Sequence, residues 1–146
     1  MEILEKKSIK LNQSFTTKEE AIKAAGQLLV DSNYVDQNYV DSMLEREGKA
    51  STYMGNFIAI PHGTDESKKL IQSSGISVVQ IPDGVNFGTA DAEKLVTVVF
   101  GIAGVGNEHL DILSQIAIYC SEIENVAKLA SAQSEDEIIN LLGGIE

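Results

Sequence analysis

The chain of 146 residues contains two histidines, and each lies in a segment that could place it at a reactive site. His62 stands between Pro61 and Gly63, at the end of the apolar run 57–60. Imidazole changes between nucleophile, acid and cation near neutral pH. Proline ends a strand ladder, and glycine permits an unusual turn and a close approach of the backbone. We expect His62 to project from a strand tip into a cleft. The alternative is a histidine in a tight loop, satisfied by a backbone carbonyl.

His109 follows the glycine-containing segment 104–106 and falls in the first turn of a predicted helix. Free backbone N–H groups gather at such a position, and the helix dipole favours an anion there. The same field disfavours an imidazolium, so we expect a neutral ring that donates a hydrogen bond. Taken alone, His109 is better explained as a surface histidine near a helix start.

Arg46 is the third candidate, at the end of a predicted helix that leads into the strands before His62. A guanidinium fork suits a phosphoryl group, although most arginines at such positions are solvated charges beside a helix C-terminus. The two histidines, Arg46 and a helix N-terminus form a phosphoryl site only if the fold brings them together.

Cys120 is the only cysteine and lies in an apolar, helix-like stretch, which predicts a small buried core residue. No cysteine and histidine cluster has metal-ligand spacing, so neither a metal nor a cofactor is expected.

The net charge of −11 argues against binding of nucleic acid by a basic face, so no nucleic-acid partner is expected. The sequence contains no long apolar run, so insertion into a membrane is not expected. Its N-terminus does not have a basic end followed by an apolar stretch, as a signal peptide would. We therefore expect a cytoplasmic protein. The length fits one domain that spans residues 1–146.

The pattern along the chain predicts an α/β fold. Thr17 and Glu20 have the spacing of a capping box at the start of a helix that ends near residues 31–33. A second helix is predicted over about 36–46, ended by Gly48. Strands are predicted at 52–54, 57–60, 75–81 (with a turn at Pro82–Gly84) and 94–102. Helices are predicted at 108–119 (capped by Asn107), at 122–129, and from Ser134, with Glu137 completing a second capping box, to residue 142. Helices before and after the strands indicate a central sheet covered on both faces.

The motifs Met43–Glu47, Tyr53–Thr64 and Asn107–Leu110 together resemble the IIA component of the mannitol-type phosphotransferase system, within the mannitol/fructose family of IIA domains. The resemblance covers nearly the whole chain, from Thr17 to Leu142. It implies a single EIIA type-2 domain with a mixed sheet of about five strands between helical layers, a three-layer α/β/α fold.

The resemblance also implies a phosphotransferase activity. Phosphorylated HPr would donate to His62, which would pass the group to a cysteine of a mannitol-type IIB (IICB) component, in support of mannitol uptake. His109 resembles the second active-site histidine and Arg46 the arginine that accompanies the pair. Asn56 stands where relatives can carry an acidic residue. No cofactor is implied, and we expect a monomer.

The expected reaction is an in-line attack by neutral His62, and the resemblance implies that Nε2 is the attacking atom. Nδ1–H would then need an acceptor, most simply a backbone carbonyl. An apolar rim and nearby acidic side chains should face the donor protein. The apolar candidates for rim or core are Phe57, Ile58, Ile60, Val85 and Phe87, and the acidic candidates are Asp65, Glu66, Asp91 and Glu108.

Two alternatives stay open at this point. One is a regulatory IIA-like protein, of the nitrogen type or detached from a transcriptional regulator, which would be phosphorylated but would act by binding a partner. The other is a hydrolase that uses both histidines, which no metal-ligand set or triad-like context supports.

Overall fold

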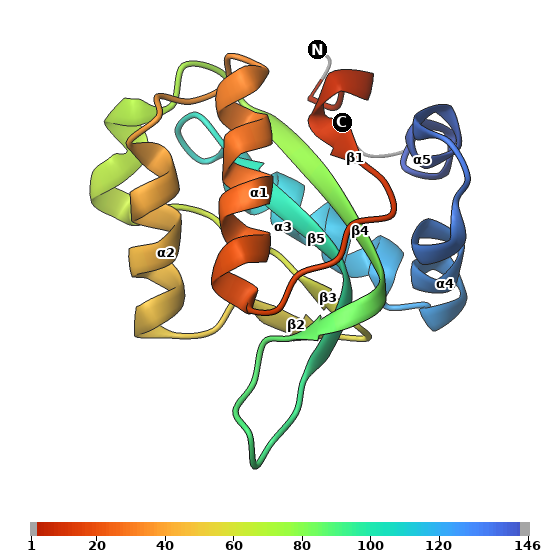
Figure 1. Ribbon diagram of the computed structural model, residues 1–146. Coiled ribbons are helices and arrows are strands. Elements are labelled where there is room, and N and C mark those ends of the chain that lie inside the picture. The colour runs from red at the N-terminus through yellow and green to blue at the C-terminus, as the bar shows by residue number, and fades with distance from the viewer. Residues whose placement is uncertain (1–2, 144–146) are drawn as a thin grey trace.

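A five-stranded mixed sheet forms the centre of the computed structural model, which describes residues 3–143 (Figure 1). The strands lie in the order β1-β4-β5-β3-β2. Strands β4 and β5 are antiparallel, whereas β1 runs parallel to β4 and β3 runs parallel to β5. Their bounds are Ile9–Lys10 (β1), Tyr53–Gly55 (β2), Ile58–Ala59 (β3), Gly75–Asn86 (β4) and Leu95–Ala103 (β5). The predicted mixed sheet is confirmed, and the ends of the expected domain, residues 1–2 and 144–146, lie outside the described residues.

Helices cover both faces of this sheet. On one face, α1 (Lys18–Asp31) and α2 (Tyr39–Lys49) pack on the side chains of Val79 and Val99. On the other face, α3 (Glu108–Cys120), α4 (Ile123–Ser131) and α5 (Glu135–Leu141) pack on Val78 and Val98. Two short 3₁₀ helices, η1 (Lys6–Ser8) and η2 (Asp65–Leu70), complete the described elements. The three-layer α/β/α architecture is therefore confirmed, with apolar side chains on both faces of β5, as its nearly continuous apolar sequence predicts. None of the helices in the described range is both long and apolar enough to cross a membrane.

The predicted helix caps are formed to different degrees. At α1, the hydroxyl of Thr17 accepts from Glu20 N (3.3 Å) and the Glu20 carboxylate accepts from Thr17 N (3.1 Å), which completes the capping box. At α5, Ser134 Oγ accepts from Glu137 N (3.1 Å), but the Glu137 carboxylate accepts from N of residue 133 instead of the cap residue. Asn107 occupies the N-cap position of α3, yet its side chain forms no cap hydrogen bond.

Three local predictions were wrong. Gly48 does not end α2, which continues through it to Lys49. The segment Pro82–Gly84 is not the turn after β4 but a bulge within it, after which pairing with β5 resumes at Val85. Proline is tolerated there because a bulge breaks the ladder locally, and the chain reverses only beyond Asn86, in the hairpin that projects at the bottom of Figure 1. Phe57 has a positive φ of 69°, so β3 begins one residue later than predicted.

The position of Gly48 leads to a stability prediction. A Cβ added to Gly48 would meet no atom within 4 Å, so Gly48→Ala keeps the helix and removes the excess backbone entropy of glycine from the unfolded chain. We expect the free energy of unfolding in a denaturant titration to rise by about 0.5–1 kcal/mol. Gly26→Ala in α1 is the matched control, because its Cβ would lie 3.0 Å from Met43 Sδ. Loss of stability in the Gly48 variant would contradict this account of α2.

Candidate functional site

His62 lies where the line of β3 ends beside β5. Ile60 N donates to Thr52 O (3.0 Å), and Ile102 N donates to Pro61 O (3.0 Å). His62 itself pairs with Ile102 as an isolated parallel bridge. The carboxyl ends of parallel strands are the common place for ligand sites in open α/β sheets. The structure therefore places His62 at the strand tip that its sequence context predicts.

The hydrogen bond of the His62 ring fixes its tautomer. His62 Nδ1 lies 2.8 Å from Ile60 O. A carbonyl oxygen can only accept, so Nδ1 carries the hydrogen and the lone pair of the neutral ring is on Nε2. Both interpretations of the sequence hold at once, since the ring is bound to a backbone carbonyl and also lines a cleft. The resulting group is a nitrogen nucleophile with a fixed orientation.

The surroundings of His62 keep it neutral. Burial lowers the pKa of His62, and the positive charge of Arg46 and the nearby imidazole of His109 lower the pKa further. The hydrogen bond to the Ile60 carbonyl and the carboxylate of Glu47 oppose this shift without reversing it. A pKa below 6.5 leaves the Nε2 lone pair available at neutral pH.

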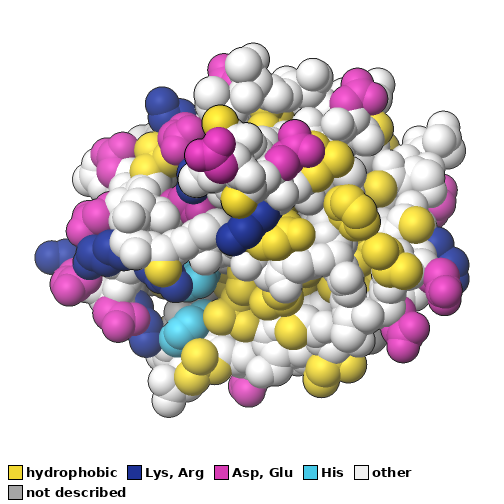
Figure 2. Space-filling view, turned by 90° about the horizontal axis from the view of Figure 1, so that it is seen from below, with side chains coloured by type: hydrophobic (Ala, Val, Ile, Leu, Met, Phe, Trp, Pro, Cys, Tyr) yellow, Lys and Arg dark blue, Asp and Glu magenta, His cyan; other side chains and the backbone are white. Residues whose placement is uncertain are grey.

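The three predicted site residues line one cleft of about 250 Å³, which brings His62, His109 and Arg46 together. Figure 2 shows the two histidines side by side at the surface, with basic side chains close to them and a broad hydrophobic area beyond. The remaining lining residues are Tyr39, Lys49, Gly63, Thr64, Asp65, Glu66, Lys68, Ile71 and Gly104.

His109 reaches the cleft from the first turn of α3, which begins at Glu108. The backbone of Gly104 packs directly on this turn, since a Cβ there would lie 2.3 Å from His109 N. His109 Nδ1 is buried and has no hydrogen-bond partner among the described residues. A buried N–H without an acceptor is rare in proteins, so the neutral ring is better accommodated with its hydrogen on Nε2. His109 can then donate through Nε2–H.

The loop before α3 is held by two side chains that the sequence did not single out. Ser74 Oγ donates to the Glu108 carboxylate and accepts from Val105 N (2.9 Å). Lys68 Nζ donates to Gly106 O (3.3 Å). Neither Ser74 nor Lys68 belongs to a recognisable local pattern, because both contacts join segments more than thirty residues apart.

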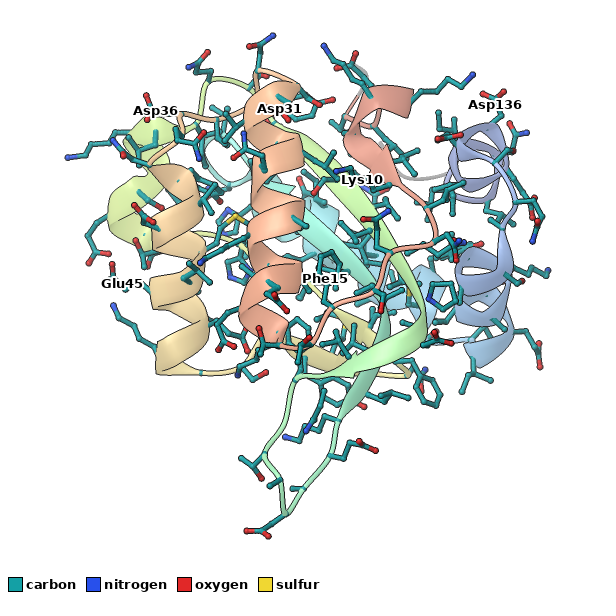
Figure 3. The ribbon with its side chains drawn as sticks, viewed as in Figure 1. Lys10, Phe15, Asp31, Asp36, Glu45 and Asp136 are labelled. Carbon is teal, nitrogen blue, oxygen red and sulfur yellow. The ribbon has the colours of Figure 1, made fainter. Side chains whose placement is uncertain are left out.

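Arg46 combines both roles considered for it. Its Nη1 donates to Ala50 O (2.7 Å) just beyond α2, so the guanidinium does interact with the end of its own helix. It also lines the cleft and acts electrostatically on His62. Lys49 and Lys68 line the same cleft, and Lys49 pairs at 3.9 Å with Glu45 on the outer side of α2 (Figure 3). The cleft can therefore neutralise negative charge brought to His62.

A buried carboxylate supports the strand that carries His62. Glu47 Oε1 accepts from Thr52 N (3.0 Å) and from Thr52 Oγ1 (2.5 Å), and its other oxygen accepts from Lys18 Nζ (3.3 Å). Glu47 is only 5% exposed, and a buried charge needs such complete pairing. Because Thr52 O in turn binds Ile60 N, these contacts connect α1 and α2 to the backbone next to His62.

The apolar candidates divide into core and surface. Ile58, Ile60, Val85 and Phe87 are buried core residues, whereas Phe57 is 41% exposed. The sequence did not single out Met54, Val105, Leu110, Ile118 and Ile123, which are the other large exposed hydrophobic residues of the described chain. Val105 lies in the loop before α3 and Leu110 lies in its first turn, next to His109 in the chain.

The acidic candidates have different positions. Asp65 and Glu66 line the cleft, and Asp91 lies in the hairpin between β4 and β5. Glu108, expected to face a partner, is bound to Ser74.

Asn56 and Cys120 have structural roles. Asn56 adopts a positive φ of 50°, and its Nδ2 donates to the carbonyl oxygens of Cys120 (3.0 Å) and Ser121 (3.2 Å) at the end of α3. A carboxylate could not donate these bonds. Burial raises the pKa of the Cys120 thiol to about 12, as suits a core residue and not a nucleophile.

Known proteins resemble this chain over nearly its whole length. The family model described as "Phosphoenolpyruvate-dependent sugar phosphotransferase system, EIIA 2" matches residues 2–144. The chain is 59% identical to the mannitol-specific phosphotransferase enzyme IIA component of Enterococcus faecalis, over 94% of this chain and 95% of that protein. It is 56% identical to the protein of the same description from Bacillus subtilis, over 99% of both chains.

Two solved structures from Escherichia coli have the same fold. One is a complex of enzyme IIAMTL with phosphorylated enzyme IIBMTL, which matches with a TM-score of 0.91 and 37% identity over 99% of both chains. The other is the crystal structure of IIA mannitol, with a TM-score of 0.88 and 38% identity over 95% of this chain and 98% of that one.

The environment of His62 predicts an unusual titration. In a pH titration of the ring followed by ¹⁵N NMR, His62 should become half protonated below pH 6.5 and should show the Nδ1–H tautomer above that point. Because the folded pKa lies below the unfolded value, the folded state binds fewer protons, and His62 lowers the free energy of unfolding as the pH falls below 6.5. A midpoint at or above 6.5 would contradict the assigned environment.

The close contact of Gly104 with α3 predicts a second effect. Gly104→Ala forces its Cβ into the backbone of His109, so we expect a loss of about 1–3 kcal/mol in the free energy of unfolding and altered NMR signals of His109. Gly48→Ala serves as the control, since its Cβ meets nothing. Unchanged stability and unchanged His109 signals would show that the contact is not tight.

Proposed function

Because the chain belongs to the EIIA 2 family of the phosphoenolpyruvate-dependent sugar phosphotransferase system, we propose that His62 is the residue on which it carries the phosphoryl group. The group comes from the phosphohistidine of HPr and passes to the cysteine of a mannitol-type IIB component, in support of mannitol uptake. The single observation that carries this proposal is the bond of Nδ1 to Ile60 O, which leaves Nε2 as a nucleophile inside a cleft lined by cations.

The transfer balances without movement of a proton on this chain. Nε2 of His62 attacks phosphorus in line, a new N–P bond forms, and the N–P bond of the donor breaks, with its electron pair returning to the donor imidazole. Nδ1 keeps its hydrogen and continues to donate it to Ile60 O throughout. The second step repeats this displacement, with a thiolate of IIB as the nucleophile and Nε2 as the leaving group. Both steps depend on positioning and on stabilisation of charge.

His109 and Arg46 stabilise that charge. Nε2–H of His109 donates to a phosphoryl oxygen, and the Arg46 guanidinium neutralises negative charge together with Lys49 and Lys68. His62 comes from the sheet, His109 from α3 on one face of it and Arg46 from α2 on the other, so the phosphoryl group lies where α2, α3 and the ends of β3 and β5 meet.

The mannitol assignment and the IIB partner have separate support. The relatives at 56–59% identity are described as mannitol-specific IIA components, and the Escherichia coli chain with a TM-score of 0.91 is in complex with phosphorylated IIBMTL. Two different proteins must reach the same imidazole, and the exposed Val105 and Leu110 near His109 offer them one shared apolar surface. The chain acts as a monomer in each encounter.

The test is incubation with phosphorylated HPr, followed by mapping of the acid-labile phosphate by mass spectrometry. His62→Ala should accept no phosphate, and retained labelling would refute the assignment. His109→Gln should still be labelled on His62 but should pass the group to IIB about 100-fold more slowly, because a flexible amide replaces the imidazole that is held in position to donate to the phosphoryl oxygens. Labelling of His109→Gln would also show that this variant is folded.

Further outcomes decide between the candidate functions. Normal onward transfer in His109→Gln would remove His109 from the mechanism. Labelling of His62 with no transfer to a mannitol-type IIB would support the regulatory IIA-like alternative. Release of free phosphate from a simple phosphate ester would support a hydrolase.

A further inference from the structure

The Tyr39 side chain crosses from α2 to the backbone on either side of the nucleophile. Its hydroxyl accepts a hydrogen bond from Gly63 N (2.9 Å) and donates one to Ile102 O (2.9 Å). Gly63 directly follows His62, and Ile102 is the residue that pairs with His62 across the sheet. The sequence places Tyr39 within the helix predicted over about 36–46 and does not single it out.

The hydroxyl acts at a rung of the sheet. In a parallel pair, the N–H of a residue donates to a carbonyl of the partner strand, and the C=O of the same residue accepts from an N–H two residues further along that strand. Ile102 N donates to Pro61 O (3.0 Å), so the following rung would join Gly63 N to Ile102 O. The Tyr39 hydroxyl connects those two groups. The Tyr39 side chain therefore reinforces the pairing of His62 with Ile102 at the point where the imidazole leaves the sheet.

The contact is buried and tightly packed. Tyr39 is 2% exposed, and a Cβ on Gly63 would lie 2.6 Å from Tyr39 Cε1 and 2.6 Å from Ser42 Oγ. The φ of Gly63 is not positive, so this glycine is required for close packing and not for the unusual turn that the sequence suggested. Burial raises the pKa of Tyr39 to about 12, which keeps the hydroxyl a donor at neutral pH.

The same helix carries Arg46. Positions 39 and 46 are two helical turns apart and share one face of α2, and both residues line the cleft. The Tyr39 hydroxyl thus connects the helix that supplies the guanidinium to the strand end that supplies the imidazole.

We propose that Tyr39 is a positioning residue for phosphoryl transfer, whose hydroxyl holds the His62–Gly63 backbone against β5 and so aims Nε2 into the cleft. The Ile60 carbonyl fixes the ring, and Tyr39 fixes the backbone from which the ring extends. The effect on rate rests on the proposed function, whereas the effect on the geometry of His62 does not.

Tyr39→Phe removes the hydroxyl and keeps the ring. With HPr as donor, kcat for acceptance should fall about tenfold or more, with little change in KM, because the imidazole is less well aimed while the docking surface is intact. In the unphosphorylated variant, hydrogen exchange of the Gly63 amide should accelerate, and the pKa of His62 should rise towards 6.5 as water enters.

Tyr34→Phe is the matched control. Tyr34 is also buried, at 4% exposure, and its hydroxyl donates to Glu5 Oε1 (3.0 Å) at η1, a different part of the structure. This variant should lose stability but keep the wild-type kcat, His62 pKa and Gly63 exchange.

The outcomes separate the two proposals. An unchanged kcat and an unchanged His62 pKa in Tyr39→Phe, or an equal loss of kcat in Tyr34→Phe, would overturn the positioning role. If Tyr39→Phe does not fold, hydrogen exchange of the Gly63 amide in the wild-type protein tests the proposal instead. Fast exchange would show that the bond from Gly63 N to the Tyr39 hydroxyl is absent, and slow exchange would support this bond. Failure of the wild-type protein to label at His62 would refute the proposed function, while the exchange and titration results would still decide the role of Tyr39.

Discussion

The site depends on one hydrogen bond, from His62 Nδ1 to the carbonyl oxygen of Ile60. This bond determines which ring nitrogen carries the hydrogen, and it orients the other nitrogen. Because His62 and Ile60 are only two positions apart, their hydrogen bond fixes the direction of the ring in the molecule only if the backbone around them is rigid. The hydrogen bonds from Ile60 N to Thr52 O and from Ile102 N to Pro61 O provide that rigidity. Thr52 is fixed in turn by the Glu47 carboxylate, which accepts from its N and Oγ1.

The charge of the cleft around His62 is opposite in sign to the net charge of the whole chain. The whole chain carries a net charge of −11, yet Arg46, Lys49 and Lys68 line the cleft around His62 together with only two acidic side chains, Asp65 and Glu66. Burial and nearby positive charge both disfavour an imidazolium, so the same cationic surroundings that would favour an anion in the cleft leave the Nε2 lone pair of His62 unprotonated. The acidic surface elsewhere remains available to attract a basic partner protein.

The three-layer architecture explains why the candidate site residues come from separate parts of the chain. The layer of α1 and α2 supplies Arg46 and Tyr39, the sheet supplies His62, and the layer on the opposite face supplies His109. These elements meet at the carboxyl ends of β3 and β5, where neither strand continues and space is left for a ligand.

The sequence alone determined the class of fold, most of the helices and strands, and the identity of His62, His109 and Arg46 as the candidates, because these follow from local periodicity, caps and short motifs. It did not determine that the three side chains share a cleft, or that Tyr39, Ser74 and Glu47 support them. Those contacts depend on how separate segments pack and on how their side chains are oriented. The Tyr39 hydroxyl, for example, binds Ile102 O, which is 63 positions away in the chain. The same limit explains the errors at Gly48 and Pro82: a glycine or proline signals a break from its backbone preference, but packing against neighbouring elements decides whether the helix or strand continues through it.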